Sequence, residues 1–339
     1  MKITKKDFGL GYTLIEIEND NGVKLRVSDL GARIVGLLIP GEKTRDLVVG
    51  FDNAQEYIQK DLYVGATIGR TAGRLIGGNF KINETIYQAD VNEHTGNTLH
   101  GANGFISDKW TFSIKNNEVV FTHTSPDGEY GYPGNLSVEV KYTLNNDNIW
   151  SVEYQAKTDK DTLFNPTNHV YFNLTGNVEN TINEHMLMID ADEFLPLSQH
   201  STPIGIKEKV KETVFDFRQP KRLSEVFASD FPQKKLVDGI DHPFLLNKTK
   251  NKLDAALFLP KENISIEVTT SEPAVIIYTA NGWPDGLDVR GQSSVKHSSI
   301  TFETQVAPGA VEFPELKLGT IILKANETYT SKTDYKIKF

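Results

Sequence analysis

The segment NPTNHVYFNL, residues 165–174, carries side chains suited to a polyhydroxylated ligand. On a strand, alternate residues share a face, so this segment would present the following residues together: Asn165, Thr167, His169, Tyr171 and Asn173. That face has amides, a hydroxyl, an imidazole and a phenol but no Lys or Glu. Such neutral donors and acceptors exchange hydrogen bonds with sugar hydroxyls. The alternative is a buried hydrogen-bond network that orders the core, because buried polar groups are normally paired.

A second segment, SSITFETQV at residues 298–306, offers a carboxylate in the same kind of surroundings. On a strand, Thr301, Glu303 and Gln305 share one face. Glu303 then sits among neutral polar residues, with no cation beside it in the sequence. A partly buried carboxylate of this kind has a raised pKa, as a general base requires. The alternative is an exposed strand glutamate, since Glu is mostly found on surfaces.

Two loops add further candidates. The segment TLHG, residues 98–101, places His100 in a glycine-rich loop, where functional side chains are over-represented. The segment GIDHPF, residues 239–244, offers Asp241 beside a histidine. Its carboxylate could bind sugar hydroxyls or cap a turn. Neither loop by itself specifies a reaction.

The segment GRTAGR, residues 69–74, supplies Arg70 and Arg74 among small residues. It lacks the glycine spacing of a phosphate-binding or dinucleotide-binding loop, so it argues against a nucleotide ligand. The formal net charge of the chain is -9. Nucleic acids and anionic membranes both require clustered Lys and Arg, so neither is expected as a partner.

The elements that hold these segments read as strands. Apolar and polar residues alternate over 23–28, 136–141, 152–157 and 264–268, which is typical of half-buried strands with one wet face. Helical patterns are few and short: one over 54–59, with Asp52 as its cap, and one over 223–227. Strands without long intervening helices predict antiparallel sheets in a sandwich or barrel. No linker or internal repeat divides the chain, so we expect one domain over residues 1–339.

Composition limits the chemistry and the compartment. There are no cysteines, which excludes disulfides, thiolate catalysis and cysteine-ligated zinc. The first residues carry lysines but no apolar region behind them, unlike a secretory signal. No run approaches the roughly 18 apolar residues of a membrane helix. We therefore expect a cytoplasmic protein that does not bind membranes.

Taken together and in this order, TLHG, NPTNHVYFNL, GIDHPF and FETQ resemble the galactose mutarotase (aldose 1-epimerase) family. The segments at 27–40 and 131–136 are also similar to it, so the resemblance extends over nearly the whole chain. It implies an all-β fold, a large antiparallel β-sandwich (the mutarotase-like supersandwich) with few short helices and an open sugar cleft on one face. It also implies an isomerase that interconverts the α and β anomers of free hexoses such as galactose and glucose.

The resemblance assigns roles by position. Glu303 corresponds to the general base, His169 to the general acid, and His100 to a second histidine that holds the substrate and supports charge at the ring oxygen. Arg74 and Asp241 match hydroxyl-binding residues. We also expect Asn168 and Tyr171 to bind substrate.

One position departs from the family pattern. The family loop usually reads Ala-Asn-Arg, and here it reads Ala72-Gly73-Arg74. The missing amide removes one sugar contact and bears on sugar preference more than on the reaction.

The implied reaction is simple. Removal of the C1 hydroxyl proton and protonation of the ring oxygen open the hemiacetal, rotation about C1–C2 exposes the other carbonyl face, and the same groups close the ring. We expect no cofactor and no metal, and an acid and a base that reach the bound ring from its two ends. An anionic Glu and a cationic His coexist between roughly pH 4.3 and 6.5, and their attraction widens that window unless desolvation outweighs it. The expected partner is a small hexose, and the protein is expected to be a monomer or homodimer.

Four alternatives compete with this interpretation. A glycosidase would use Glu303 and Asp241 as a carboxyl pair about 5 to 10 Å apart. A carbohydrate-binding module would share the polar strand without needing an acid and a base. A relative that acts on a sugar phosphate would need extra cations, for which Arg70, Arg74 and Arg290 are candidates. A metal site of His100, His169 and Asp241 has suitable ligand types but no close-spaced ligand pair.

The run from Trp283 to Gln292 looks like a variable edge of the cleft. The sequence assigns it no role.

Overall fold

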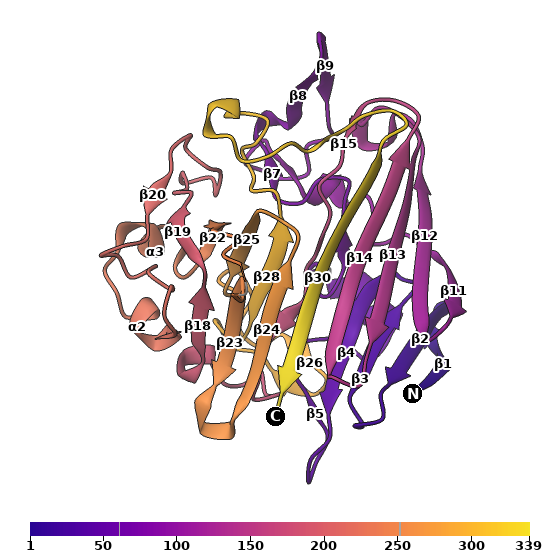
Figure 1. The fold of residues 1–339 in the computed structure, drawn as a ribbon, viewed down its shortest axis with the longest axis vertical. Helices are drawn as coiled ribbons and strands as arrows, with labels where there is room; N and C mark the ends of the chain where they lie inside the picture. The colour runs from indigo at the N-terminus through magenta and orange to yellow at the C-terminus, as the bar shows by residue number, and fades with distance from the viewer. Residues whose placement is uncertain (61, 251) are drawn as a thin grey trace.

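The computed structural model describes residues 1–60, 62–250 and 252–339. Its largest element is a nine-stranded antiparallel sheet with β30, drawn in yellow, beside β14 and β24 near its middle (Figure 1). In spatial order the strands are β11 (Thr111–Lys115), β12 (Glu118–Ser125), β13 (Leu136–Leu144), β14 (Ile149–Thr158), β30 (Thr328–Lys338), β24 (Ile264–Thr270), β23 (Ala255–Leu259), β18 (Met186–Ile189) and β21 (Lys221–Arg222).

Two smaller antiparallel sheets form the second layer. The six-stranded sheet has the order β17 (Tyr171–Phe172), β28 (Ile300–Gln305), β25 (Ala274–Tyr278), β22 (Asp241–Leu246), β19 (Ala191–Phe194) and β20 (Glu208–Lys209). The five-stranded sheet has the order β1 (Lys2–Gly9), β2 (Tyr12–Glu18), β3 (Lys24–Ser28), β4 (Arg33–Ile39) and β5 (Arg45–Asp46). One buried cluster, from Ile15 to Ile337, contains residues of all three sheets, so the large sheet packs against both smaller ones. The predicted antiparallel β-sandwich is confirmed.

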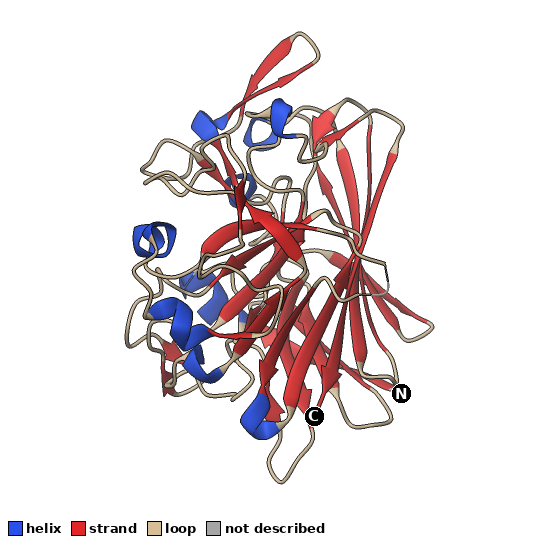
Figure 2. Cartoon of the chain, turned by 60° about the vertical axis from the view of Figure 1, so that its left-hand side comes forward, coloured by secondary structure: helices blue, strands red, loops and turns tan. Residues whose placement is uncertain are grey.

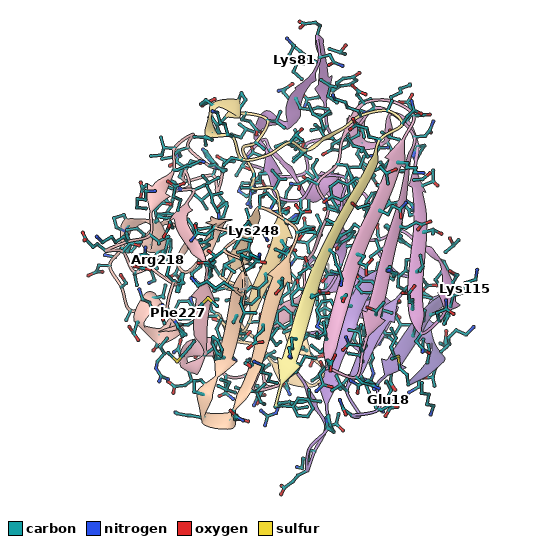
Figure 3. All side chains as sticks on the ribbon, viewed as in Figure 1. Glu18, Lys81, Lys115, Arg218, Phe227 and Lys248 are labelled. Carbon is teal, nitrogen blue, oxygen red and sulfur yellow. The ribbon has the colours of Figure 1, made fainter. Side chains whose placement is uncertain are left out.

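The four predicted strand segments are confirmed as parts of β3, β13, β14 and β24. In β13, residues Leu136, Val138 and Val140 are buried while Ser137 and Glu139 between them are exposed. The alternation arises because each strand of the large sheet has one face on the core and one toward water. Lys115 at the edge of the large sheet points outward, and so does Lys81 on the projecting hairpin of β8 (Asn79–Ile82) and β9 (Thr85–Gln88) (Figure 3).

In the described part of the chain, five short antiparallel pairs complete the strands. They are β6 (Thr67–Ile68) with β16 (Thr167–Asn168), β7 (Arg74–Leu75) with β10 (Thr98–Leu99), β8 (Asn79–Ile82) with β9 (Thr85–Gln88), β15 (Thr162–Leu163) with β29 (Ile322–Leu323), and β26 (Asp288–Val289) with β27 (Gln292–Ser293).

The α-helices are α1 (Ala54–Lys60), α2 (Leu223–Phe227) and α3 (Pro232–Val237), and Figure 2 shows the short helices at the periphery of the strands. Short 3-10 turns cover 76–78, 100–103, 129–131, 182–184, 260–262 and 314–316. The first two helices were predicted and the third was not. The predicted cap of α1 was wrong, because Oδ1 of Asn53 rather than Asp52 accepts the N–H of Glu56 (3.1 Å). No helix in the described part of the chain is long and apolar enough to cross a membrane.

Candidate functional site

A cavity of about 410 Å³ lies against the face of the six-stranded sheet that is turned away from the large sheet. The register of the sheet explains which side chains reach it. Glu303 on β28 pairs with Ile276 on β25, which pairs with Pro243 on β22, and all three line the cavity. Their neighbours in sequence, such as Phe302 and Ile277, belong to the buried core on the other face. Period-2 alternation therefore gives one strand both a core face and a site face.

Glu303 is buried, at 4% exposure, so the alternative of an exposed strand glutamate was wrong. The hydroxyl of Thr301, two residues earlier on the same face, donates to Oε1 of Glu303 (3.2 Å). Burial raises the pKa of Glu303 to about 8, against smaller opposing effects of the Thr301 hydrogen bond and the Arg74 charge. The carboxyl thus has the perturbed affinity for protons that is typical of acid–base groups.

His169 lies beside this carboxyl, with its Nε2 3.3 Å from Oε1 of Glu303. Burial lowers the pKa of His169 to about 4. Attraction between the two groups was expected to widen the pH range of the ionised pair unless desolvation outweighed it, and here desolvation is the larger effect. Desolvation disfavours both charges and moves the two pKa values in opposite directions, so the pair is neutral near pH 7.

The segment that carries His169 is not the single strand predicted for residues 165–174. It pairs with β6 through β16 and then with β28 through β17, and at His169 the backbone bonds instead to Ala66 and Gly65. Within it, only the side chains of His169 and Tyr171 line the cavity among the five on the predicted polar face.

The other three side chains of that face form hydrogen bonds with buried backbone. The amide of Asn165 exchanges bonds with Val306, Thr167 donates to the carbonyl of Thr304, and Asn173 donates to that of Ser298. The sugar-facing interpretation and the buried-network alternative therefore each describe part of the segment.

His100 joins the pair from a separate loop. Its ring packs edge-on against His169, with centroids 5.2 Å apart, and against Tyr63 at 4.6 Å. The N–H of Gly73 donates to Nδ1 of His100 (3.3 Å), so the neutral ring carries its proton on Nε2. Burial holds the pKa of His100 well below its usual value, which keeps the ring a neutral donor. The loop needs glycine at 101, where φ is +65° and a Cβ would lie 2.2 Å from the carbonyl oxygen of Gly69.

Arg74 and Asp241 supply the charged part of the wall. Nε and Nη2 of Arg74 donate to the carboxylate of Glu93 at 2.9 to 3.2 Å. Burial opposes the charge of Arg74, but Asp241 and Glu93 outweigh it and the pKa is raised. Burial raises the pKa of Asp241 to about 7, while Arg74 draws it down.

Of the remaining predicted binding residues, Tyr171 reaches the cavity and Asn168 does not. The ring of Tyr171 packs against those of His169 (4.9 Å) and Trp283 (4.7 Å). The amide of Asn168 instead donates to the hydroxyl of Tyr142 (3.0 Å) and to the carbonyl of Gly65 (3.2 Å). The expectation for Asn168 needs correction, because alternation turns this side chain to the face opposite His169.

Comparison with known proteins identifies the family. The family model described as aldose 1-epimerase matches residues 13–336. The chain belongs to the aldose 1-epimerase family. It is 34% identical to the aldose 1-epimerase of Haemophilus influenzae, with 97% of each chain covered, and 36% identical to the galactose mutarotase of Bos taurus, with 99% and 98% covered. The solved galactose 1-epimerase from Lactobacillus acidophilus is similar over 99% of this chain and 98% of its own, with a TM-score of 0.87 and 31% identity.

For an aldose 1-epimerase family member, the departure at Gly73 has a local structural reason. At this position φ is +74°, and a Cβ would lie 2.5 Å from Cγ of Pro308. Pro308 therefore occupies the space that a side chain at 73 would need. Gln305 lies next to this space, with its Nε2 3.8 Å from such a Cβ, and both polar atoms of its buried amide lack hydrogen-bond partners among the described residues.

The side chains that could bind a metal ion differ from the set that the sequence suggested. One ligand atom each from His100, His169 and Glu303, rather than Asp241, lies within 4.8 Å of the other two. Nδ1 of His100 already accepts the Gly73 N–H, and Oε1 of Glu303 is in contact with Thr301 and His169. These contacts suit proton transfer between the side chains and a ligand.

Two of the alternative functions, the sugar-phosphate enzyme and the binding module, lose their support. Arg70 is buried and donates to the backbone carbonyls of Ser125, Pro126, Pro133 and Gly134, and Arg290 binds Asp46 and the carbonyl of Val35. Two of the three cations proposed for a sugar phosphate are therefore structural. The relatives' names also favour neither a sugar-phosphate enzyme nor a binding module.

Several cavity residues were missed or left without a role by sequence reasoning. Tyr63, Tyr278 and Asn281 line the cavity, as does Trp283, which the sequence had only placed on a cleft edge. Glu93, which holds Arg74, lies in a loop where no spacing or periodicity marks it. Aromatic residues are common in cores, so only their positions around the cavity distinguish these tyrosines.

Proposed function

We propose that this protein interconverts the α and β anomers of a free hexose, with Glu303 and His169 as the proton-transferring pair. The observation that carries the proposal is their 3.3 Å contact at the cavity wall, where both side chains are at least 95% buried. The carboxylate of such a pair can take up one proton while the imidazolium beside it releases another, which is what opening a hemiacetal requires.

The closeness of the two groups suits the geometry of the reaction. Both reacting oxygens, the C1 hydroxyl and the ring oxygen, are bonded to C1 and lie about 2.3 Å apart, and each group must come within roughly 2.6 to 3.2 Å of one oxygen. Two groups in contact with each other can do so. We therefore infer that both groups act at a single carbon, rather than from the two ends of the ring.

The proton count of the pair is the quantity that matters for turnover. Ring opening moves one proton from the C1 hydroxyl to Glu303 and one from His169 to the ring oxygen, and ring closure returns both. The pair therefore holds one proton throughout, on either partner. Burial raises the pKa of Glu303 to about 8 and lowers that of His169 to about 4, so one proton is held between these values.

The charge of Arg74 lowers the pKa of Glu303 and so makes the ionised base easier to reach. His100, neutral with its proton on Nε2, acts as a hydrogen-bond donor that holds the substrate and supports charge at the ring oxygen. Arg74 and Asp241 bind ring hydroxyls, as charged groups at a cavity wall commonly do for polar ligands. Tyr171 and Trp283 form an apolar surface for a sugar face.

Polarimetry of freshly dissolved α-galactose and α-glucose tests the proposal. Wild type should accelerate anomer exchange, and Glu303→Gln and His169→Asn should each lower kcat by about 100-fold or more. Glu139→Gln, at an exposed site on β13, is the matched control and should leave kcat unchanged. Near-wild-type turnover in either cavity variant refutes the assignment, and release of a chromogenic aglycone from a glycoside would instead indicate a glycosidase.

A further inference from the structure

The loop at residues 92–97 makes a set of contacts that the mechanism has not used. The N–H of Nε of Arg74 is shared between the two carboxylate oxygens of Glu93 (3.0 and 3.2 Å), and Nη2 donates to Oε1 (2.9 Å). Glu93 is itself held, because the hydroxyl of Thr95 donates to its Oε2 (3.1 Å) and its backbone bonds to Asn97. A forked pair of this kind fixes both the position and the plane of a guanidinium.

The same loop is tied to the strands that carry the site. Asn97 accepts the N–H of Gly77 (3.1 Å), which follows β7. Asn92 exchanges two side-chain hydrogen bonds with the backbone of Leu99, the residue before His100. Leu99 pairs in register with Arg74 across β10 and β7. The loop is thus bonded both to the chain that follows Arg74 and to the residue before His100.

Arg74 also has two acidic neighbours at the cavity wall. It interacts electrostatically with Asp241 and Glu303, and all three line the cavity. Among the hydrogen bonds of the described residues, those of the Arg74 side chain come from Nε and Nη2, and Nη1 donates none, so this edge of the guanidinium is open to a ligand. If Arg74 turned to pair with Asp241, two hydroxyl-binding groups would satisfy each other and both would be lost to the sugar.

We propose that Glu93 is a positioning residue for sugar binding, which holds Arg74 away from Asp241 so that both can bind hydroxyls. The expected effect of Glu93 on the rate of anomer exchange rests on the proposed function, whereas the expected effect on sugar affinity does not. Glu93 is not among the residues that line the cavity, so it acts through Arg74.

The test measures polarimetric rates and, separately, calorimetric galactose affinity for Glu93→Gln, Arg74→Lys and the double variant. Loss of a charge-assisted fork should raise KM and Kd about 10- to 100-fold in Glu93→Gln, with kcat changed by less than about threefold. If Glu93 acts through Arg74, the double variant should be no weaker than Arg74→Lys alone. Glu184→Gln, which breaks an exposed pair with Arg222 (3.0 Å), is the matched control and should change neither constant.

Two results would overturn the proposal. One is a Glu93→Gln variant with a lowered unfolding midpoint and kcat but an unchanged KM and Kd, which indicates a structural role. The other is an effect of Glu93→Gln that adds in full to that of Arg74→Lys. If wild type fails to accelerate anomer exchange, the proposed function is refuted, and the calorimetric affinities still decide the role of Glu93.

Discussion

Replacing the buried carboxyl of Glu303 by an amide should stabilise the protein, and the gain should grow with pH. Burial raises the pKa of Glu303 from 4.5 to about 8 in the folded protein, while the unfolded chain ionises near the ordinary value. Between these values the folded state holds a proton that the unfolded state has released. The free energy of unfolding therefore falls as pH rises through this interval, and the contribution of Glu303 is fully favourable only below its unfolded pKa.

The size of the effect follows from the shift, since one pKa unit corresponds to about 1.4 kcal/mol. The carboxyl costs the wild type about 1 kcal/mol at pH 5, about 3 kcal/mol at pH 7 and about 5 kcal/mol at pH 9. Glutamine has nearly the same shape and no ionisation. The stability difference between Glu303→Gln and wild type should therefore grow by about 2 to 3 kcal/mol from pH 5 to pH 7.

Urea unfolding at pH 5, 7 and 9 measures this difference, and thermal unfolding should show it as roughly 3 to 4 °C between pH 5 and 7. His169, whose pKa is lowered to about 4 by burial, adds stability as pH rises, but both proteins contain it and its contribution largely cancels. Glu139→Gln on the exposed face of β13 is the control, and its difference from wild type should not change with pH.

The opposite outcome would have a clear meaning. If Glu303 and His169 form an ionised pair, the carboxylate is stabilised in the folded state and its pKa lies below 4.5. The stability difference between Glu303→Gln and wild type would then stay nearly constant from pH 5 to pH 7, because the contribution of such a carboxylate is lost only as pH falls below about 5. A pH-independent or falling difference therefore refutes the account of a neutral pair with one shared proton.

Three further predictions concern activity and the cavity wall. The pH dependence of kcat should be bell-shaped, with limbs near 4 and 8 set by the buried acid–base pair, and a profile flat across both limbs would contradict it. Gly73→Asn should destabilise the protein by about 1 to 3 kcal/mol in urea unfolding, because φ is +74° and Pro308 crowds the new Cβ. Adding Pro308→Ala to this variant should recover part of the lost stability. Full stability of Gly73→Asn alone would argue against the clash. Arg70→Lys should lower the unfolding midpoint without changing KM, since the guanidinium binds backbone carbonyls outside the cavity; a raised KM with an unchanged midpoint would place it in the sugar site.

Much of the site could be read from local pattern. Alternation along 298–306 placed Thr301, Glu303 and Gln305 on one face, and all three lie on the cavity side of β28. The same reasoning was weaker over 165–174, because that segment changes pairing partner at His169. Alternation predicts which residues share a face of a strand, but not which part of that face lines a cavity. It therefore could not distinguish His169 and Tyr171 from the buried amides beside them.

The sequence by itself determined the fold class and the available chemistry. Its period-2 patterns indicated an all-β chain, and its composition excluded thiol chemistry. Short motifs that resemble one family identified the acid, the base and the arginine. Tertiary structure alone decided the protonation of the central pair, because desolvation depends on every atom packed around Glu303 and His169. The tertiary structure also decided which arginines are structural, and it placed Glu93 in hydrogen-bond contact with Arg74. These outcomes arise from contacts between segments far apart in the chain, and no local pattern encodes such distances.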